Sequence, residues 1–304
     1  MIRRPTFRLK MAVALLMSVL LALVAPAAAS PVQDTWTAQK REVRLTNGLR
    51  LAYVELGDPK GEPLLLLHGY TDSSRSWSLV APHLSRYRLI IPDQRGHGAS
   101  DAPECCYGPS QYAFDARLLM EALGIERSAV VGHSMGSMVA MAMAAEYPDR
   151  VASIVLIGST ASAPVKPGDW LYDQVAALKF PLDRHSAFMK EWHPANQPTP
   201  VDSAFAAAVM EELLTIEPHV WRSVMRELAQ LPVGRHAADV KAPVLILSGG
   251  KDPLFPPEHH AGLLKAFPSA QAHVFPSLGH NPNWEQPEAV AKRIDDFLQR
   301  VRRS

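Results

Sequence analysis

Short apolar runs alternate with helical stretches along most of this chain, and this rhythm limits the folds that it can adopt. The runs cover residues 63–67, 87–91, 128–131, 151–157, 243–247 and 270–275. They lack a regular polar alternation, so they fit strands that are covered on both faces. Helical patterns cover residues 111–123, 137–146, 258–267 and 287–302. The alternation predicts an α/β fold with a mostly parallel sheet and helices on both of its faces.

Two further strands are expected ahead of this alternation. Residues 41–45 and 49–54 are rich in β-forming residues, and Asn47-Gly48 lies between them. Both positions tolerate a positive φ, so the dipeptide predicts an antiparallel hairpin with a two-residue turn. This pair brings the expected sheet to eight strands.

The strand–helix rhythm breaks between residues 160 and 240. This segment has no convincing strand pattern, and several prolines separate its helical stretches. The helical stretches cover residues 170–178, 184–192, 201–216 and 219–231. We interpret residues 160–240 as a helical cap that is inserted into an α/β core formed by residues 30–159 and 241–304.

The first 29 residues resemble a secretory signal in their order of residue types. Four basic residues lie within residues 1–10, an apolar run covers 11–25, and Ala27-Ala28-Ala29 supplies the small residues that a signal peptidase recognises. We expect cleavage after Ala29 and a periplasmic or secreted protein with no stable membrane insertion. The apolar run is shorter than the roughly 20 residues that a spanning helix needs. An uncleaved membrane anchor is the alternative, and the Arg3-Arg4 pair leaves twin-arginine export open beside the general route.

Charge and cysteine content exclude some classes of function. The full chain has a formal net charge of +1, and the chain without residues 1–29 would have a charge of −3. This acidic balance argues against nucleic acid as a partner. The two cysteines, Cys105 and Cys106, are adjacent, so they either form a vicinal disulfide or remain two thiols. No Cys/His spacing predicts a zinc site.

The sharpest chemical signal is the motif Gly-His-Ser-Met-Gly at residues 132–136. It lies between an apolar strand and a helical pattern, which is the context that a nucleophile elbow requires. The two glycines lack Cβ atoms, so chain segments can approach closely around the turn. We therefore predict that Ser134 is a nucleophile, and we interpret the neighbouring His133 as structural.

A serine hydroxyl needs a general base, and the base needs an acid that orients it. Asp252 follows the predicted strand 243–247, and His280 follows the strand 270–275. In a parallel sheet these positions lie at the same edge as Ser134. The turn after the strand that ends at Ile157 offers no competing acid. We predict that Ser134, Asp252 and His280 form a catalytic triad.

Two backbone N–H groups are expected to bind the oxyanion. One belongs to Met135, directly after the nucleophile. The other belongs to Tyr70, in the loop that follows residues 63–67. His68 and Gly69 are expected to shape this loop, although a plain turn would also explain them.

These motifs together resemble the α/β-hydrolase superfamily. The resemblance is carried by His68-Gly69-Tyr70, the run Asp93-Gln-Arg-Gly-His-Gly-Ala-Ser100, the motif at 132–136, Asp252 and His280, and it covers roughly residues 41–302. Within the superfamily the chain resembles the serine-nucleophile group of capped esterases, lactonases, haloperoxidase-like enzymes and carbon–carbon-bond hydrolases. The resemblance implies a structural role for residues 93–100. Similar dehalogenases and epoxide hydrolases carry Asp at the elbow, so Ser134 points to acyl transfer.

The expected function is hydrolysis of a small-molecule carboxylic ester, including a lactone, without a cofactor or metal. Cleavage of C–C, amide or thioester bonds, or acyl transfer to peroxide, would use the same motifs. A non-catalytic binding protein on this fold is a further alternative. Trp77, Leu254 and Phe255 are candidates for the substrate pocket because they lie near the predicted triad or oxyanion loop in sequence. In the cap, Trp170, Met189, Trp192 and Trp221 either line the pocket or pack the cap itself.

Overall fold

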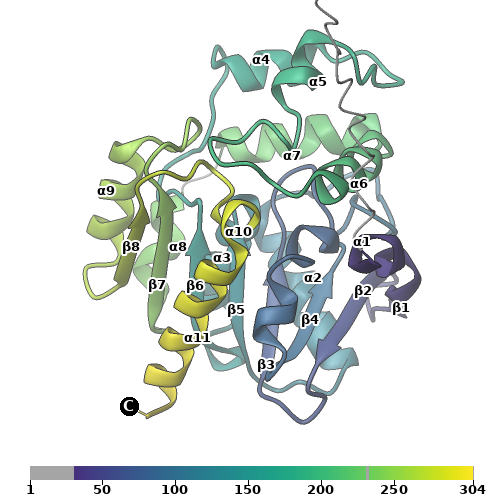
Figure 1. Ribbon diagram of the computed structural model, residues 1–304. Helices are drawn as coiled ribbons and strands as arrows, with labels where there is room; N and C mark the ends of the chain where they lie inside the picture. Colours follow the sequence, from purple (N-terminus) through teal and green to yellow (C-terminus); the bar gives the residue numbers. More distant parts are fainter. Residues whose placement is uncertain (1–30, 231–232, 304) are drawn as a thin grey trace, which may run out of the picture.

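A computed structural model describes residues 31–230 and 233–303 of the chain (Figure 1). Eight strands form one sheet in the order β1-β2-β4-β3-β5-β6-β7-β8. Only the β1–β2 and β2–β4 pairs are antiparallel. This confirms the predicted α/β fold with a mostly parallel eight-stranded sheet. The strands are β1 (Arg41–Arg44), β2 (Arg50–Gly57), β3 (Pro63–Leu67), β4 (Arg88–Pro92), β5 (Ser128–His133), β6 (Val151–Ile157), β7 (Val244–Gly249) and β8 (Gln271–Phe275).

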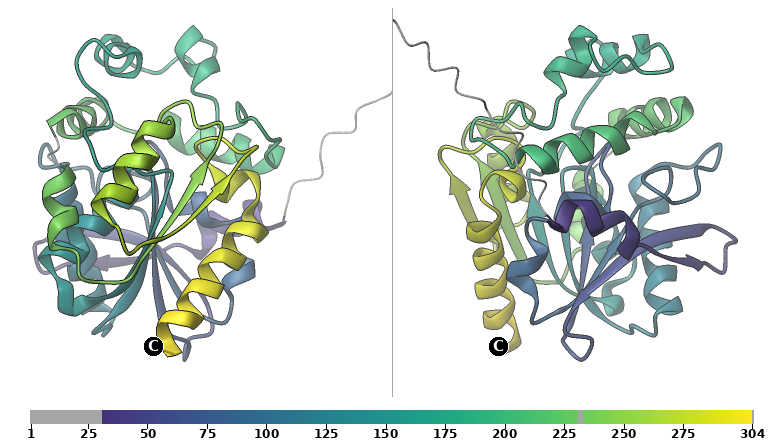
Figure 2. Two further views of the ribbon diagram at one scale, coloured as in Figure 1. Left: turned by 90° about the vertical axis from the view of Figure 1, so that its left-hand side faces the viewer. Right: turned by 45° about the vertical axis from the view of Figure 1, so that its right-hand side comes forward.

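The buried strands send alternate side chains to two separate apolar clusters. In β3, Leu65 and Leu67 belong to one cluster, while Leu64 and Leu66 belong to the other. Helices α2 (Pro109–Ala122) and α3 (Met135–Glu146) cover the first face. Helix α11 (Pro287–Arg303) covers the second face, on the opposite side of the sheet in Figure 2. Double coverage explains why the strands have continuous apolar sequences.

The register brings the carboxyl ends of the central strands to one edge. Leu67 at the end of β3 is paired with Gly132 in β5, and Gly132 is paired in turn with Leu156 in β6. Leu156 is paired with Ile246 in β7. The loops that follow these strands therefore leave the sheet close together. Ligands of parallel α/β sheets bind at this edge.

The hairpin between β1 and β2 has a longer turn than the sequence predicted. Leu45 N–H donates to the Leu49 carbonyl at 2.8 Å, so three residues rather than two form the turn. Only Gly48 has a positive φ, of 87°, and the Asn47 side chain accepts from Leu49 N–H instead. A three-residue turn that ends in a left-handed glycine is a common hairpin solution, so the prediction of the hairpin was correct and its turn type was wrong.

Five helices lie between β6 and β7, and the described residues of this segment contain no strand. Helices α4 (Trp170–Ala177), α5 (Ala187–Glu191), α6 (Ser203–Leu214) and α7 (Pro218–Gln230) lie above the carboxyl edge of the sheet (Figure 1). Helix α8 (Val233–Asp239), which the sequence analysis missed, packs against α3. We use the word cap for α4–α7, and the division of the chain at residues 160 and 240 stays a prediction.

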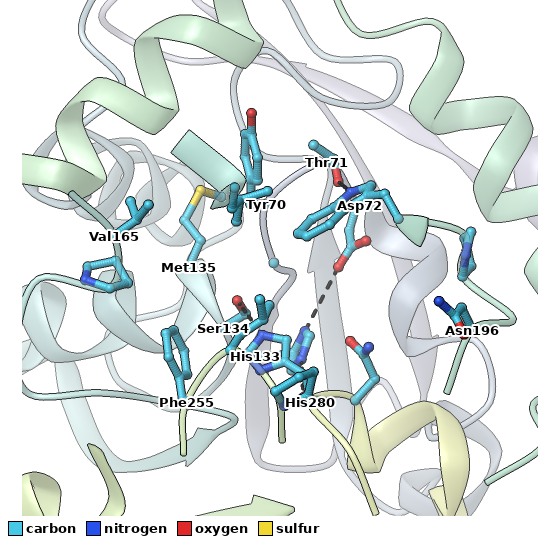
Figure 3. A pocket seen from close by; sticks show the side chains of 18 of the residues that line it. Tyr70, Thr71, Asp72, His133, Ser134, Met135, Val165, Asn196, Phe255 and His280 are labelled. Atoms are coloured by element: carbon cyan, nitrogen blue, oxygen red, sulfur yellow. Dashed lines mark hydrogen bonds and ion pairs between the residues drawn. The ribbon is translucent and has the colours of Figure 1, made fainter. Parts of the chain in front are cut away.

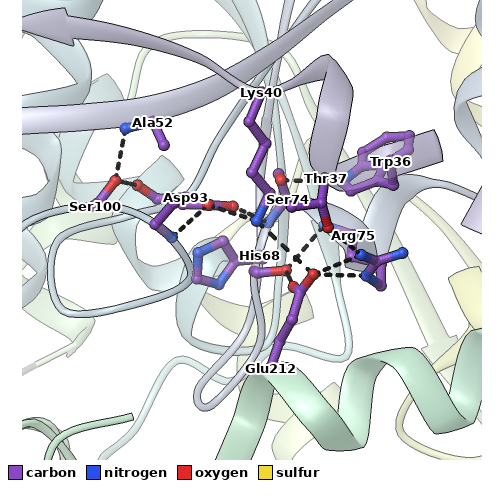
Figure 4. A network of polar contacts seen from close by, with 12 residues as sticks. Trp36, Thr37, Lys40, Ala52, His68, Ser74, Arg75, Asp93, Ser100 and Glu212 are labelled. Atoms are coloured by element: carbon purple, nitrogen blue, oxygen red, sulfur yellow. Dashed lines mark hydrogen bonds and ion pairs between the residues drawn. The ribbon is translucent and has the colours of Figure 1, made fainter. Parts of the chain in front are cut away.

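A buried polar network joins the core to the cap (Figure 4). The Lys40 ammonium lies 2.8 Å from the Asp93 carboxylate, which also accepts from the N–H groups of Ser74 and Ala99 at 2.8 Å. On the cap side, Glu212 of α6 accepts from Arg75 at 2.7 Å. Burial alone would raise the pKa of Asp93, but Lys40 and these N–H donors lower it. The carboxylate is therefore a charged structural centre, in agreement with the structural role expected for residues 93–100.

Very close backbone approaches hold the turn after β5. A Cβ atom added to Gly136 would lie 2.3 Å from the Leu67 carbonyl oxygen and 2.6 Å from that of His68. These distances are far below van der Waals contact, so only glycine allows α3 to start against the end of β3. The approach places the loop after β3 directly beside Ser134.

Two sequence expectations concern other parts of the chain. The expected signal and its cleavage after Ala29 lie outside the described residues and stay predictions. Cys105 and Cys106 form a vicinal disulfide, which decides between the two alternatives left open.

Among the helices described for residues 31–230 and 233–303, none is long and apolar enough to cross a membrane.

The substitution Asp93→Asn tests the importance of the buried ion pair. It removes the carboxylate nearest to the Lys40 ammonium and leaves Glu212, at 3.8 Å, as the remaining counter-charge. We therefore expect a loss of about 1.5–3 kcal/mol in the free energy of unfolding, measured by urea denaturation. The matched control is Glu211→Gln on α6, which removes an exposed partner of Arg184 and should leave the denaturation midpoint unchanged. A loss below about 1 kcal/mol for Asp93→Asn would contradict the assignment.

A pair of glycine substitutions tests the close approach at the elbow. Gly136→Ala forces the backbone of β3 away from α3, and we expect it to lower the free energy of unfolding by roughly 1–3 kcal/mol. Gly262 lies inside α9 (Pro257–Ala266), and nothing lies within 4 Å of the position of its missing Cβ. Gly262→Ala should therefore be stabilising by about 0.5–1 kcal/mol. Equal effects of the two substitutions on thermal or urea unfolding would argue against the steric explanation.

Candidate active site

Ser134 occupies a strained backbone position between β5 and α3. Its φ is 50° and its ψ is −120°, a conformation that costs energy for any residue with a Cβ. Its N–H donates to the Ile157 carbonyl at 2.9 Å, which fixes the turn to the end of β6. The strain and the anchor together hold the side chain at the edge of the sheet where the loops meet.

The structure brings the three predicted side chains together. The Nε2 atom of His280 lies 2.9 Å from Ser134 Oγ, and its Nδ1 atom lies 2.8 Å from Asp252 Oδ2. These contacts fix one tautomer, in which Nδ1–H donates to the carboxylate and Nε2 can accept the serine proton. The arrangement can therefore transfer a proton from the hydroxyl to the imidazole.

The backbone around Asp252 keeps its carboxyl group ionised. The second oxygen, Oδ1, accepts from the N–H groups of Leu254 and Phe255 at 2.8 and 2.9 Å. Burial alone would raise the pKa of Asp252, but the neighbouring His280 and these two N–H groups lower it below its usual value. A charged carboxylate is thus available to stabilise an imidazolium at His280.

The loop after β3 lies across the site from His280. His68 Nδ1–H donates to the Gly69 carbonyl at 2.8 Å, and His68 Nε2 accepts from Gln94 N–H at 2.9 Å. Burial lowers the pKa of His68 to about 3, so the ring is neutral and stabilises the loop through these two hydrogen bonds. These hydrogen bonds support the expectation that His68 shapes the loop and takes no part in the reaction.

Tyr70 and Met135, predicted to supply the oxyanion donors, both line the cavity at Ser134. Within the described chain, neither backbone N–H donates a hydrogen bond. The N–H groups are therefore available to an oxygen atom that arrives next to the serine hydroxyl.

The cap holds this same loop at two side chains. The Tyr70 hydroxyl donates to the Trp221 carbonyl at 2.8 Å. Thr71, whose φ is 62°, accepts from the Trp192 indole N–H at 3.0 Å. The position of the expected oxyanion donors therefore depends on the cap as well as on the core.

A cavity of about 820 Å³ opens between the cap and the sheet edge. Figure 3 shows Met135, Val165 and Phe255 on one side of Ser134, and Asp72 and Asn196 on the other. The labelled side chains on the first side are apolar and those on the second, polar side carry hydrogen-bonding groups, with Ser134 between them. Such a cavity suits a small molecule with two chemically different ends.

The structure places some of the predicted pocket residues in the cavity wall and others elsewhere. Leu254 and Phe255 line the cavity, as do Trp170 and Trp192 of the cap. Trp77 does not, because it is fully buried in the apolar cluster on the other face of the sheet, with Trp36 and Val80. Met189 and Trp221 are also fully buried and pack the cap, so they are absent from the cavity wall.

The sequence analysis missed Asp72 in the polar half of the cavity. Its position three residues after Gly69, in a loop already under consideration, was an available signal. Burial raises the pKa of Asp72 to about 7, although the Ser76 hydroxyl, the Gly69 N–H and the nearby His280 act in the opposite direction. A carboxyl group that titrates near neutrality beside a reactive serine is a functional candidate.

No cluster of three or more His, Cys, Asp or Glu side chains that could hold a metal ion occurs in the described ranges.

Comparisons with known proteins agree with the fold. The chain is 29% identical over 286 residues to the 2-hydroxy-6-oxononadienedioate/2-hydroxy-6-oxononatrienedioate hydrolase of Paraburkholderia phymatum, across 88% of this chain and 98% of that protein. It is 29% identical over 276 residues to Lipase 1 of Psychrobacter immobilis, across 84% and 83% of the two chains. Its structure is similar to a thermophilic esterase from Thermogutta terrifontis, with a TM-score of 0.70, 27% identity and coverage of 86% and 99%.

The family described as alpha/beta hydrolase fold matches residues 62–287, which include the elbow, both predicted partners of Ser134 and the loop after β3. Hydrolases of different bonds occur among the similar proteins, so the match identifies the fold and the general class of enzyme. From the sheet, the elbow and this match we conclude that the chain belongs to the α/β-hydrolase family and is a hydrolase.

Proposed function

We propose that this protein is a serine hydrolase that cleaves a carboxylic ester, including a lactone, through an acyl-enzyme intermediate. The observation that carries the proposal is the continuous chain of contacts from Asp252 through His280 to Ser134 Oγ, at the floor of an open cavity. This arrangement activates a hydroxyl that would otherwise be a poor nucleophile at neutral pH.

In the first half-reaction the Ser134 oxygen attacks the ester carbonyl, and its proton passes to His280 Nε2. The carbonyl oxygen becomes an oxyanion, and the N–H groups of Tyr70 and Met135 donate to it. Collapse of the tetrahedral intermediate breaks the bond to the alcohol oxygen, which receives the proton from His280. The alcohol leaves and the acyl group stays on Ser134.

In the second half-reaction water replaces the alcohol. His280 takes a proton from the water as the oxygen attacks the acyl carbon, and it returns the proton to Ser134 when the acid leaves. Asp252, whose pKa is lowered, remains charged and stabilises the imidazolium in both halves. The two half-reactions together consume one water molecule and return Ser134 and His280 to their starting protonation states, so no oxidant or reductant takes part.

The Psychrobacter relative, which is named a lipase, supports ester cleavage. The Paraburkholderia relative favours a second candidate, because it is named a hydrolase of 2-hydroxy-6-oxo dienedioates and the match covers 98% of its length. Cleavage of a carbon–carbon bond beside a ketone is therefore the competing proposal. Cleavage of amide or thioester bonds, or acyl transfer to peroxide, would use the same groups and has less support.

A substrate panel decides between the two candidates. p-Nitrophenyl esters of short and medium acids and simple lactones form one arm, and a 2-hydroxy-6-oxo dienoate forms the other. We expect a higher kcat/KM for the esters. Efficient turnover of the dienoate together with poor turnover of every ester and lactone would overturn the ester assignment in favour of C–C cleavage.

The substitution Ser134→Ala tests the nucleophile. It removes the hydroxyl oxygen that lies beside His280 Nε2, so we expect kcat for a p-nitrophenyl ester to fall by at least about 10³-fold, with loss of labelling by a fluorophosphonate. Ser110→Ala is a matched control, since Ser110 is an exposed serine bonded to Glu146 far from the site. Ester turnover that survives in Ser134→Ala would disprove the proposal.

The substitution Asp252→Asn tests the orienting acid. An amide can still accept from Leu254 and Phe255 N–H, but it removes the charge that stabilises the imidazolium and favours the wrong tautomer of His280. We expect kcat to fall by about 10³–10⁴-fold with a much smaller change in KM. Unchanged thermal unfolding would show that the loss is chemical, and a fall below tenfold would reject the role of Asp252.

A further inference from the structure

The carboxamide of Asn281 is a largely buried polar group without a partner in the protein. Asn281 directly follows the base His280 and is only 8% exposed, yet it lines the cavity at Ser134. Neither Oδ1 nor Nδ2 makes a hydrogen bond within the residues that the structure describes. Both atoms keep accessible surface, unlike those of Asn283, which are fully enclosed. Most buried polar side chains in proteins have a partner, so this group is free to bind a ligand.

The helix that begins after Asn281 does not use this carboxamide. Asn281 is the N-cap of α10 (Pro282–Glu285), where an Asn side chain ordinarily accepts from a backbone N–H of the first turn. Its side chain makes no such bond. The Asn281 backbone carbonyl accepts from the N–H groups of Trp284 and Glu285 instead, at 2.9 and 3.1 Å. The side chain is therefore available to the cavity without any loss to the helix.

The backbone that carries Asn281 is held in place on its amino side. The His280 carbonyl accepts from His133 Nε2–H at 3.0 Å, and the Gly279 N–H donates to Glu285 Oε1 at 2.7 Å. The contact between His280 and Asp252 fixes the imidazole on the same segment. The carboxamide and the base therefore keep a constant relative position, which is what a preorganised binding group requires.

The proposed reaction places the alcohol half of the ester on the side of His280. The alcohol oxygen receives its proton from His280 Nε2, while the carbonyl oxygen points to the loop after β3 across the site. Asn281 is the residue next to His280 in the same cavity wall, so it lies beside the alcohol half. A carboxamide has an acceptor and two donors but no charge. It suits a hydroxyl group, and it offers no counter-charge to an ion.

We propose that Asn281 is a recognition site for a hydroxyl group on the alcohol half of the substrate. The inference rests on the proposed ester hydrolysis and narrows its substrate class to monoesters of diols and polyols. A hydroxyl group replaces the solvent at the carboxamide with a new hydrogen bond. An alkyl group in the same place covers the carboxamide and leaves it unsatisfied, which costs binding free energy.

An isosteric pair of esters with one acyl group tests the proposal. The pair is 2-hydroxyethyl butanoate and propyl butanoate, followed in a pH-stat. The measured quantity is the ratio of kcat/KM for the hydroxyalkyl ester to that for the alkyl ester. This ratio is divided by the ratio of the two rate constants for hydrolysis by hydroxide alone, which removes the difference between the leaving groups. Both esters form the same acyl-enzyme, so the corrected ratio reports recognition of the alcohol half.

We expect a corrected ratio of about fivefold or more in the unaltered protein, and of about one in Asn281→Leu, whose side chain is similar in size and has no polar atom. Gln286→Met is the matched control, because Gln286 is an exposed carboxamide directly after α10 and is not one of the residues that line the cavity. The control should keep the ratio of the unaltered protein. A corrected ratio of one or less in the unaltered protein, a ratio that survives in Asn281→Leu, or an equal loss in Gln286→Met would overturn the proposal.

Partition of the acyl-enzyme gives a second measurement on the unaltered protein if Asn281→Leu does not fold. p-Nitrophenyl butanoate supplies the acyl group, and 1,2-ethanediol and 1-propanol compete at equal concentration as acceptors in place of water. The acceptor occupies the position of the leaving alcohol, so we expect about fivefold more 2-hydroxyethyl butanoate than propyl butanoate, after allowance for the two hydroxyl groups of the diol. Equal amounts of the two esters would reject the site. If water outcompetes both alcohols, the corrected ratio of the unaltered protein alone decides.

Failure of this inference is distinct from failure of the proposed function. If propyl butanoate and p-nitrophenyl esters are hydrolysed and depend on Ser134, the ester assignment holds whatever the ratio. If neither ester of the pair nor any p-nitrophenyl ester is hydrolysed, the ester assignment fails and the hydroxyl site falls with it.

Discussion

The contact between Gly136 and the carbonyl groups of Leu67 and His68 is the constraint on which the site depends. It brings the first turn of α3 against the end of β3, where no side chain could fit. Everything that surrounds the serine follows from this contact. The strained turn projects Ser134, the loop after β3 passes beside it, and Tyr70 and Met135 both line the cavity at the serine. The sheet aligns the ends of the strands, but this one backbone contact brings the loop after β3 close to Ser134.

Three buried aspartates around this edge behave differently because their partners differ. Asp93 is paired with the Lys40 ammonium and with backbone donors, so it is a permanent structural charge. Asp252 has His280 and two N–H groups, which keep it charged for the chemistry. For Asp72, the Ser76 hydroxyl, the Gly69 N–H and the nearby His280 lower the pKa less than burial raises it, so the pKa is about 7. Environment, rather than residue type, determines which carboxyl group is structural, which orients a base, and which titrates near neutrality.

The sequence alone predicted the strands and motifs that short, continuous stretches of residues determine. Burial on both faces produces continuous apolar runs, so β3 and β6 could be predicted with their observed bounds. The strand–elbow–helix context located Ser134, and the positions after two later strands located Asp252 and His280. Helix α8 was missed because its short segment has no clear apolar period and is positioned by α3.

The remaining errors concern information that only the folded chain contains. Trp77 is close to the loop after β3 in sequence, but it lies in the 3-10 turn Ser74–Trp77, and its side chain packs in the apolar cluster on the other face of the sheet. Asp72 was overlooked because its direction depends on Thr71, which adopts a left-handed backbone that no local pattern demands. The turn at Asn47-Gly48 differs for a related reason, since the pairing of Leu45 with Leu49 sets its length.

The contacts between the cap and the loop after β3 have a consequence for how such enzymes diversify. Trp192 donates to Thr71, the Trp221 carbonyl accepts from Tyr70, and Glu212 binds Arg75 a few residues further on. The roof of the cavity and the loop predicted to supply the oxyanion donors are thus held together by direct hydrogen bonds. A cap exchanged between two members of the family would carry a new specificity only if it also reproduced these three anchors. Recombination at the boundaries of this segment would otherwise yield chains that bind a ligand and fail to turn it over.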